Sequence, residues 1–298
     1  AYDWGEVVRT YSGVEPRFAA NYQLNDVSSA KLSYNRTRQF IHLISNTTSP
    51  TPIDVWRPSG EYIEPATADQ IALGYFRNFS DNQFEASAEV YYKHFQGLVD
   101  YKAGAELILN ERLETELLSG TGDAYGVELQ IKKRKGLLTG WISYTLARSE
   151  RDIPGINNDE PYPSNYDRLH DLSVVAIYPI SEKLKLGANF AFTSGRAITY
   201  PDSRYVVQGI QVPNYNNRNG ERAPSYHRLD LSLTYTPKPN SNKRWKGEWV
   251  FSVYNVYNRR NPFSVYFRQD ADNPTRTEAV RLSVFGSIVP AVTYNFQF

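Results

Sequence analysis

Apolar and polar residues alternate at every second position through most of this chain. In the segment 83–95, Phe84, Ala86, Ala88, Val90 and Tyr92 alternate with polar or charged neighbours. Successive side chains of a β-strand point to opposite faces, so this pattern predicts strands with one apolar and one polar face. The same alternation predicts eleven strands, at 14–24, 31–41, 70–79, 83–95, 124–134, 138–148, 168–178, 183–194, 225–236, 246–257 and 288–298.

The connections between these segments alternate between short and long. The short ones are NDVSS, SDN, KG and SEK, and the proline- and asparagine-rich PKPNSNKR joins 225–236 to 246–257. The long ones run over 45–67, 99–121, 149–165, 195–223 and 258–279, with a short helix expected in LILNERLETELL and an extra strand in FSVYFR. Short turns at one end, long loops at the other and strands of about 11 residues are typical of outer-membrane barrels. A soluble sandwich or propeller, the alternative, gives no reason for this sorting.

The final segment, 288–298, is the most apolar strand and ends on an aromatic residue. In a soluble protein such a terminal strand would leave an exposed edge that favours aggregation. In a membrane barrel the last strand pairs with the first, and its aromatic residues face lipid. We therefore expect Tyr294, Phe296 and Phe298 to form a C-terminal assembly signal.

Eleven strands cannot close into an antiparallel barrel, because closure needs an even number. We expect residues 1–298 to form a single incomplete domain, the C-terminal half of a barrel of about 22 strands, without the N-terminal plug of such large barrels. The absence of an initiator methionine and of a signal peptide suggests a mature product or a fragment.

Composition fits this interpretation. Aromatic residues make up 14% of the chain, with 23 tyrosines, which suit positions between lipid and water. The mean hydropathy of −0.54 does not argue against a barrel, since only alternate strand residues face lipid. No apolar run is long enough for a spanning helix, which needs about 18 residues. The absence of cysteine excludes disulfides and thiolate chemistry, and a net charge of +1 gives no support for nucleic-acid binding.

Several segments resemble one family. They are 72–79 (ALGYFRNF), 89–93 (EVYYK), 98–107 (LVDYKAGAEL), 120–129 (GTGDAYGVEL), 136–151 (GLLTGWISYTLARSER), 166–172 (YDRLHDL) and 285–298 (FGSIVPAVTYNFQF). In this order they resemble the C-terminal half of a Bacteroidetes-type TonB-dependent outer-membrane receptor. The resemblance implies a bacterial outer-membrane transporter that imports a scarce nutrient, such as a chelated metal, an oligosaccharide or a peptide. The implied partners are outer-membrane lipid, the plug and remaining barrel half, the TonB complex and a surface lipoprotein that binds substrate. The alternative is a structural or secretion-associated barrel component without import activity.

An outer-membrane enzyme is a third alternative, and the residues argue against it. His42, His94, His170 and His227 lie in separate segments, without the spacing of a metal site. His170 and Asp171 are adjacent on a strand and therefore point to opposite faces. We expect no catalytic residues, no metal site and no cofactor.

Binding residues gather on loops held by a rigid scaffold, so the long loops are the expected binding region. Aromatic rings and arginines suited to polar cargo occur there, and the candidates are Trp56, Arg57, Tyr62, Asp100, Tyr101, Arg196, Tyr200, Arg204, Tyr205 and Tyr215. For any single one of them, an ordinary role as an interfacial tyrosine or a loop-packing residue is the favoured interpretation. Charged residues on the polar strand face are expected to contact the plug, and these candidates are Glu85, Glu89, Lys183, Lys185 and Asp230.

Overall fold

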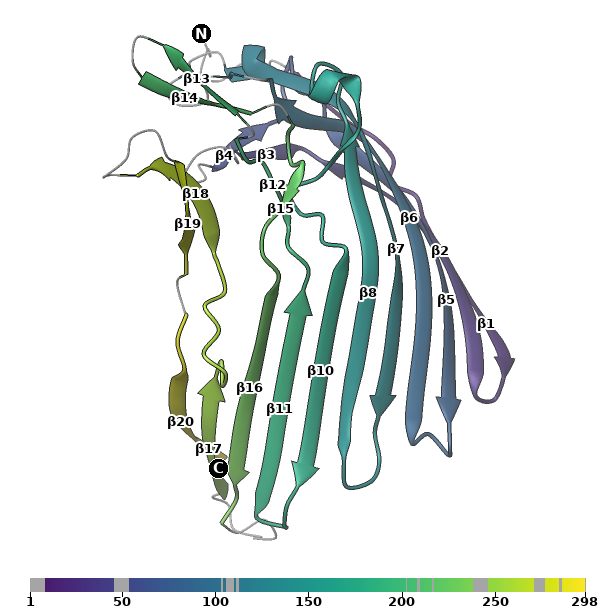
Figure 1. Cartoon of the computed structure of the whole chain (residues 1–298). Coiled ribbons are helices and arrows are strands. Elements are labelled where there is room, and N and C mark those ends of the chain that lie inside the picture. Colours follow the sequence, from purple (N-terminus) through teal and green to yellow (C-terminus); the bar gives the residue numbers. More distant parts are fainter. Residues whose placement is uncertain are drawn as a thin grey trace.

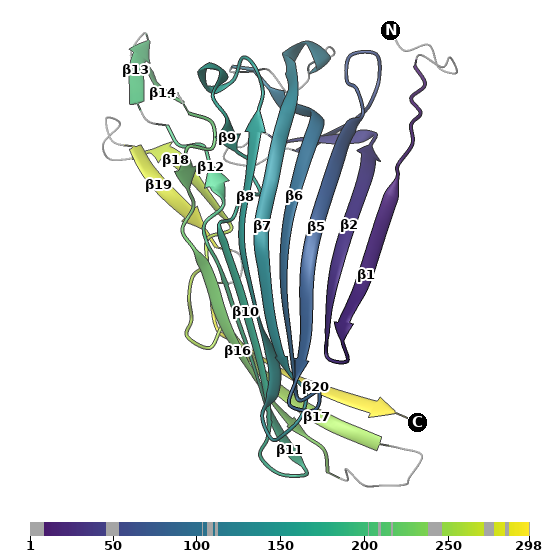
Figure 2. The ribbon, with the colours of Figure 1, turned by 90° about the vertical axis from the view of Figure 1, so that its right-hand side faces the viewer.

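The chain folds around one large antiparallel sheet. The computed structural model describes residues 9–45, 54–102, 104–105, 110, 113–201, 203–207, 210–215, 217–237, 246–270, 277–283 and 286–297. The sheet follows the order β1-β2-β5-β6-β7-β8-β10-β11-β16-β17-β20, and every pair along this path is antiparallel. It curves like part of a barrel wall, with the short turns at one end and the long connections at the other (Figures 1 and 2). The predicted all-β, antiparallel barrel fold is therefore confirmed for this chain.

Each of the eleven predicted strands corresponds to one strand of this path. The observed bounds are β1 Arg17–Asn25, β2 Ser28–Gln39, β5 Ala66–Phe79, β6 Phe84–Tyr101, β7 Leu117–Lys133, β8 Thr139–Asp152, β10 His170–Pro179, β11 Leu184–Thr193, β16 Tyr226–Tyr235, β17 Lys246–Tyr254 and β20 Val289–Gln297. The short pieces are β3 Ile41–Ser45, β4 Asp54–Pro58, η1 Leu113–Glu116, η2 Asn157–Asp159, β9 Tyr162–Pro163, β12 Ala197–Ile198, β13 Ser203–Val207, β14 Ile210–Asn214, β15 Glu221–Arg222, β18 Ser264–Gln269 and β19 Thr277–Leu282.

The segment 99–121, expected to be a loop, begins and ends in strand. β6 and β7 stay paired up to Tyr101 and Leu117, across a register shift between Gln96 and Leu98. Gly97 lies at this bulge with a φ of 68°, a conformation that glycine adopts without strain. The bulge shifts the alternation by one residue, so the sequence pattern ends there although the backbone ladder continues. Within the expected helix at 107–118, residues 113–116 form η1, a single 3₁₀ turn, and 117–118 begin β7.

The long connections also contain small hairpins. The 45–67 segment holds β4, which pairs with β3, and β13 pairs with β14 in the connection between β11 and β16. β18, which covers all but the first residue of the predicted FSVYFR strand, pairs with β19 in the connection between β17 and β20. No helix among the described residues has the length and apolar content needed to cross a membrane.

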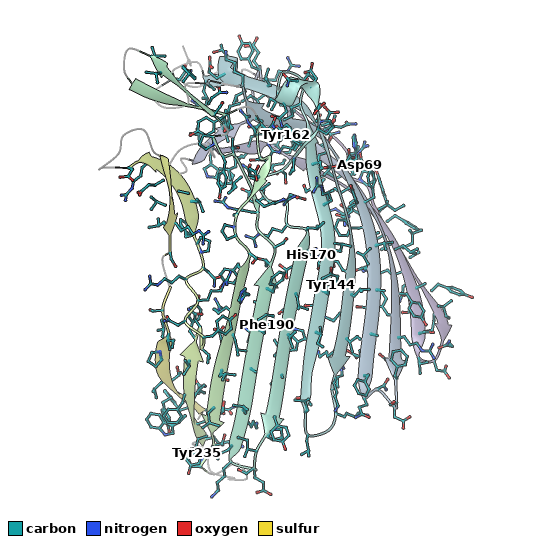
Figure 3. All side chains as sticks on the ribbon, viewed as in Figure 1. Asp69, Tyr144, Tyr162, His170, Phe190 and Tyr235 are labelled. Atoms are coloured by element: carbon teal, nitrogen blue, oxygen red, sulfur yellow. The ribbon has the colours of Figure 1, made fainter. Side chains whose placement is uncertain are left out.

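One face of the sheet is continuously apolar. Cross-strand neighbours form apolar rows over several strands: Leu32, Leu73, Val90, Val127 and Leu146; Ile142, Val174, Phe190 and Leu229; and Leu186, Leu233, Phe251 and Val292. Tyr235, at the turn end, and Phe190, halfway along the strands, show the height of this apolar face (Figure 3). None of these residues belongs to a buried cluster of the described chain, as expected for a face that contacts lipid.

The apolar face is the more open one. On β5, Ile71, Leu73 and Tyr75 are 50, 53 and 40% exposed, whereas Ala72, Gly74 and Phe76 between them are partly or fully covered. Side chains diverge on a convex face and converge on a concave one, so this difference identifies the apolar face as the outer face. The inner face carries small and polar residues such as Ser143, Thr145, Asn189 and Ser232.

A polar belt borders the apolar face at its loop end. Arg36, Asp69, His94 and Asp123 are cross-strand neighbours in one row. Arg36 donates two hydrogen bonds of 2.7 Å to the Asp69 carboxylate, and His94 Nδ1 lies 2.9 Å from Asp123 Oδ1. Farther along the sheet, Tyr144 pairs with His170 at 2.8 Å, and these two residues lie above Phe190 in Figure 3. Paired charges and phenols of this kind suit the boundary between lipid and water.

A charged side chain placed on the apolar face should destabilise the barrel. Phe190 lies between Val174 and Leu229, whereas its neighbour Asn189 lies on the inner face beside Val175 and Asp230. In the full-length protein we expect Phe190→Arg to cost about 2–4 kcal/mol of folding free energy in vesicles. Asn189→Arg is the matched control and should cost much less. Urea titrations of vesicle-inserted protein, followed by heat-dependent gel mobility, measure both, and equal losses would contradict the assigned faces.

Candidate functional site

The loop end of the sheet carries the two buried apolar clusters of the described residues. The two apolar clusters there are formed by Ile44, Tyr101 and Leu113, and by Ile153, Ile156 and Tyr162. We call this region, made of residues 39–66, 97–120, 150–169 and 195–225 as far as they are described, the loop cap. In Figure 3, Tyr162 lies within it, above the strands. Because apolar side chains are buried here and exposed on the outer face of the strands, the apolar packing of the described residues is concentrated in the loop cap.

Asp100 is the centre of an ion-pair cluster in the loop cap. Its carboxylate accepts hydrogen bonds from Arg218 Nη1 at 2.9 Å, Arg151 Nη1 at 3.3 Å and the Tyr162 hydroxyl at 2.8 Å. Arg218 also lies 3.8 Å above the Tyr101 ring and donates to the Tyr101 carbonyl. Burial, together with the Asp100 charge, raises the pKa of Tyr162 above its usual value, so its hydroxyl remains a donor. The cluster joins the ends of β6 and β8 to the β8–β10 and β11–β16 connections, which are far apart in sequence.

Asp167 forms a second cluster of the same kind. Its side chain is fully buried, and its carboxylate accepts from Arg222 Nη2 and, at 2.6 Å, from the Ser149 amide. Arg222 donates in addition to the Asp167 carbonyl at 2.9 Å. A buried carboxylate requires such partners, because an unpaired charge in a dry environment is very costly.

Asparagines complete the bracing of the loop cap. The Asn219 side chain donates to Pro163 O at 2.8 Å and to Asn165 Oδ1 at 2.6 Å. Asn157 Oδ1 accepts from the Arg218 amide at 2.8 Å, and Asn157 Nδ2 donates to the Arg218 carbonyl at 3.2 Å. Asn157 and Asn219 both have positive φ angles, which asparagine tolerates better than most residues. The connection between β8 and β10 is thereby attached to the connection between β11 and β16.

His42 lies inside the β3–β4 hairpin of the loop cap. It is 6% exposed, and its Nε2 is 3.1 Å from the Ser59 hydroxyl. Burial lowers the pKa of His42 below its usual value, and a hydrogen bond to the backbone of Glu64 offsets part of this. The imidazole is therefore held in its neutral form within the hairpin.

A cavity of about 460 Å³ opens between this hairpin, β6, β8 and the 164–166 segment. We call it the cap cavity. Its lining includes the aromatic residues Trp56, Phe95 and Tyr166 and the polar residues Gln39, His42, Asp100, Ser149, Glu150, Arg151, Ser164 and Asn165. Its volume is within the range of small-molecule sites, about 300–1,000 Å³. A second hollow, of about 440 Å³, lies at the turn end beside Lys132, Arg134 and Trp141.

The predicted loop residues occupy different environments. Trp56 and Asp100 both line the cap cavity, Arg57 follows Trp56 on β4, and Tyr62 is 77% exposed outside the cavity lining. Asp100 and Tyr101 are buried and bind other residues of the loop cap. Tyr200 and Tyr215 are half-buried, burial raises the pKa of both, Arg196 is half-buried before β12, and Tyr205 is 52% exposed on β13. The side chain of Arg204 lies outside the described residues.

The predicted plug-contacting residues lie at inner-face positions of the register or in the adjoining turn. Glu85 pairs with Arg134 at 2.7 Å, and Asp230 pairs with Arg228 at 2.9 Å. Glu89 is opposite Glu128, Lys185 is opposite Thr234, and Lys183 is in the turn before β11. Contact with a plug stays a prediction for all five. Tyr294 and Phe296 are exposed on the edge strand β20 and stack at 6.4 Å, while Phe298 lies outside the described residues.

The histidines form no constellation like that of a metalloenzyme. Among the described residues, no group of three or more His, Cys, Asp or Glu side chains is arranged to hold a metal ion. His170 pairs with Tyr144, while Asp171 is turned to the inner face opposite Thr145. His94 meets Asp123 from the neighbouring strand, a pairing that its spacing of 29 residues did not suggest.

Sequence reasoning missed most of the loop-cap cluster, namely Arg151, Tyr162, Asp167, Arg218, Asn219 and Arg222. The partners Asp100 and Arg218 are 118 residues apart, so no local pattern links them. The one available signal was composition, because NNRNGER and YDRLHDL place arginine and aspartate among turn-forming residues.

A comparison with protein families resolves what this barrel is. The model described as "TonB dependent receptor-like, beta-barrel" matches residues 2–258. The chain belongs to this family. Receptor barrels of the family lie in the bacterial outer membrane, and so does this chain. The resemblance found in the sequence is thereby confirmed at the level of the family.

Solved structures of receptors and transporters show the same fold. The pyoverdine outer membrane receptor FpvA from Pseudomonas aeruginosa PAO1 matches with a TM-score of 0.61 and 14% identity, over 95% of this chain and 36% of that chain. The FrpB iron transporter from Neisseria meningitidis matches with 0.60 and 14%, over 96% and 38%. The ferric yersiniabactin uptake receptor FyuA from Yersinia pestis matches with 0.58 and 18%, over 95% and 37%. The chain thus spans little more than a third of these receptors. No curated protein sequence matches it.

The membership places the apolar face of the receptor barrel against lipid and the loop cap outside the lipid-spanning part of the strands. Removing the Asp100 carboxylate, which is the centre of the ion-pair cluster, should therefore loosen the loop cap while leaving the strands intact. Asp100→Ala would leave Arg218, whose side chain is 9% exposed, without its partner. Breaking a buried pair in this way costs about 3–5 kcal/mol. We expect faster amide hydrogen exchange in 150–169 and 195–225 of the full-length receptor.

The matched control is Glu278→Gln, because Glu278 and its partner Arg268 are 37 and 61% exposed and 3.4 Å apart. Exposed pairs contribute about 0–1 kcal/mol, so exchange in the loop cap should stay unchanged. If Asp100→Ala also leaves exchange unchanged, the cluster does not brace the loop cap.

The β3–β4 hairpin should open in mild acid. The pKa of His42 is lowered in the folded hairpin. As pH falls below about 6.5, the unfolded hairpin takes up a proton that the folded one does not, so stability is lost on the acid side and is unaffected above it. Amide exchange of β3 and β4, corrected for intrinsic rates, should rise between pH 7.5 and 5.5. His42→Gln should abolish this rise in exchange. If the rise persists in the variant, another titrating group causes it.

Proposed function

We propose that the complete protein is an outer-membrane receptor that binds a nutrient at the loop cap and imports it with energy from the TonB complex. Support comes from one observation above the others: a barrel of the TonB-dependent receptor family carries a loop cap braced by buried ion pairs. Rigid bracing holds binding groups in place and lowers the entropy lost when a ligand binds.

A receptor of this kind also needs a plug domain and the other strands of the barrel. In this proposal a plug fills the lumen against the inner face, upstream strands pair with the edge of β1, and β20 closes the barrel. The receptors with similar folds are named for ferric siderophores, pyoverdine and iron. These names support uptake of a scarce nutrient, and a chelated metal, an oligosaccharide and a peptide are the candidates for this chain. The chemistry of such import needs no catalytic residue in the barrel.

Uptake by the full-length receptor tests this function. We expect a strain that carries the receptor to accumulate one of three labelled probes: ferric citrate, a neutral oligosaccharide or a short peptide. Accumulation should require an intact tonB gene, because the energy is supplied from the inner membrane. Equal accumulation with and without TonB for all probes would instead favour a structural or secretion-associated barrel.

The β13–β14 hairpin offers a local test of the loop candidates. Among the described residues it pairs only within itself, and it carries the exposed Tyr205. Replacing 203–214 with a short Gly-Ser linker should leave the Asp100 and Asp167 clusters and heat-dependent gel mobility unchanged. If Tyr205 contacts cargo, TonB-dependent uptake should fall by about tenfold, the effect of losing roughly 1.4 kcal/mol of binding free energy. Unchanged uptake would remove this hairpin from the binding site.

A further inference from the structure

We propose that the cap cavity binds a neutral, hydroxylated ligand, with the sugar rings of an oligosaccharide stacked on Trp56 and Tyr166. The proposal rests on the receptor function above and specifies its cargo. It follows from the aromatic walls, the charge balance and the uncommitted hydrogen-bonding groups of this one cavity.

Two exposed aromatic side chains form the walls. Trp56, on β4, is 62% exposed, and Tyr166, in the connection between β8 and β10, is 71% exposed, yet both line the cap cavity. Phe95 contributes a third ring from the inner face of β6. Aromatic rings that line a cavity supply the apolar surface on which small-molecule sites hold their ligands. The C–H face of a pyranose ring is apolar, and it packs against an aromatic ring while the hydroxyls at its edge stay hydrogen-bonded.

The charges that line the cavity are already paired. Asp100 accepts from Arg151, Arg218 and Tyr162, and Glu150 accepts from Arg148 at 2.9 Å. Arg151 is thus the only guanidinium in the lining as described, and it is held by Asp100. An anionic ferric chelate would meet two carboxylates and no cation free to bind it. A cationic peptide would also bind weakly, because the carboxylates of Asp100 and Glu150 are already paired with arginines of the chain.

Neutral hydrogen-bonding groups remain available instead. Within the described part of the chain, Gln39 Oε1, Asn165 Nδ2 and the Tyr166 hydroxyl line the cavity without a hydrogen-bond partner. They offer an acceptor, a donor and a group that does both, which matches the hydroxyls of a sugar. Such groups beside aromatic rings fit a carbohydrate better than an ion.

The neighbouring contacts fix these groups in place. Asn165 Oδ1 accepts a hydrogen bond from Asn219 at 2.6 Å, so the Nδ2 of Asn165 points away from Asn219. Gln39 Nε2 donates to the Ile41 carbonyl at 2.6 Å. Buried His42, joined to Ser59, supports the hairpin that carries Trp56. A site whose groups are held before binding loses less entropy when the ligand arrives.

Binding by the purified full-length receptor tests the site, using calorimetry with three probes: maltohexaose, cellohexaose and ferric citrate. We expect one hexasaccharide to bind, and Trp56→Ala and Tyr166→Ala each to weaken its binding at least tenfold. Trp56→Phe keeps a ring and should retain most of the affinity, whereas Tyr166→Phe keeps the ring without the hydroxyl and should weaken binding less than Tyr166→Ala does. Tyr62→Ala is the matched control, because Tyr62 is an exposed loop aromatic outside the cavity lining. Heat-dependent gel mobility confirms that each variant is folded.

The outcomes distinguish failure of the proposed ligand class from failure of the proposed receptor function. Failure of both hexasaccharides to bind, or binding that both alanine variants leave unchanged, overturns the proposal. Ferric citrate binding that Trp56→Ala weakens also overturns it, since the cavity would then take an anionic chelate. The receptor function survives in each of these cases if TonB-dependent uptake of any probe persists, and it fails only if uptake is independent of TonB.

Discussion

Backbone hydrogen bonding in lipid is the constraint on which this structure depends. A strand that crosses a membrane must satisfy each N–H and C=O group within the protein, because hydrocarbon offers no partner. The uninterrupted ladder from β1 to β20 does this for the interior strands. With the backbone paired, alternate side chains are free to serve different environments, and the chain assigns lipid to one face and a polar interior to the other. The apolar rows on the outer face of the described sheet therefore belong to no buried hydrophobic cluster.

Packing then has to occur elsewhere, and it occurs in the loop cap. The apolar clusters there are small, and buried ion pairs and asparagine hydrogen bonds supplement them. Buried pairs add less net stability than a hydrophobic core of the same volume, but they define geometry strongly, because any alternative leaves a charge unpaired. Long connections with little apolar surface can in this way adopt one arrangement above a hollow barrel.

The sequence was sufficient for the strands and insufficient for the loop cap. Alternation identified all eleven strands, because the two-residue period is a local property that the outer lipid face imposes on each strand separately. It failed at Gly97, where one extra residue reversed the alternation while the ladder continued. In the loop cap, the partners of Asp100 come from the end of β8, from the β8–β10 connection and from the β11–β16 connection, and only the folded barrel brings them together. Composition could therefore suggest Asp100 and Trp56 as candidates but could not distinguish the bracing residue from the cavity wall.

That distinction bears on how cargo is chosen. Arginine and aspartate in receptor loops suggest a site for charged ligands, yet here Arg148, Arg151, Arg218 and Arg222 each bind a carboxylate of the chain itself. A ligand that recruited them would have to break pairs that also hold the connections together. The charged residues therefore act as supports, and selectivity passes to the uncharged groups between them. Similar barrels can thus present cavities of different chemistry, because loop-cap charges either remain open to cargo or, as in this chain, are used for bracing.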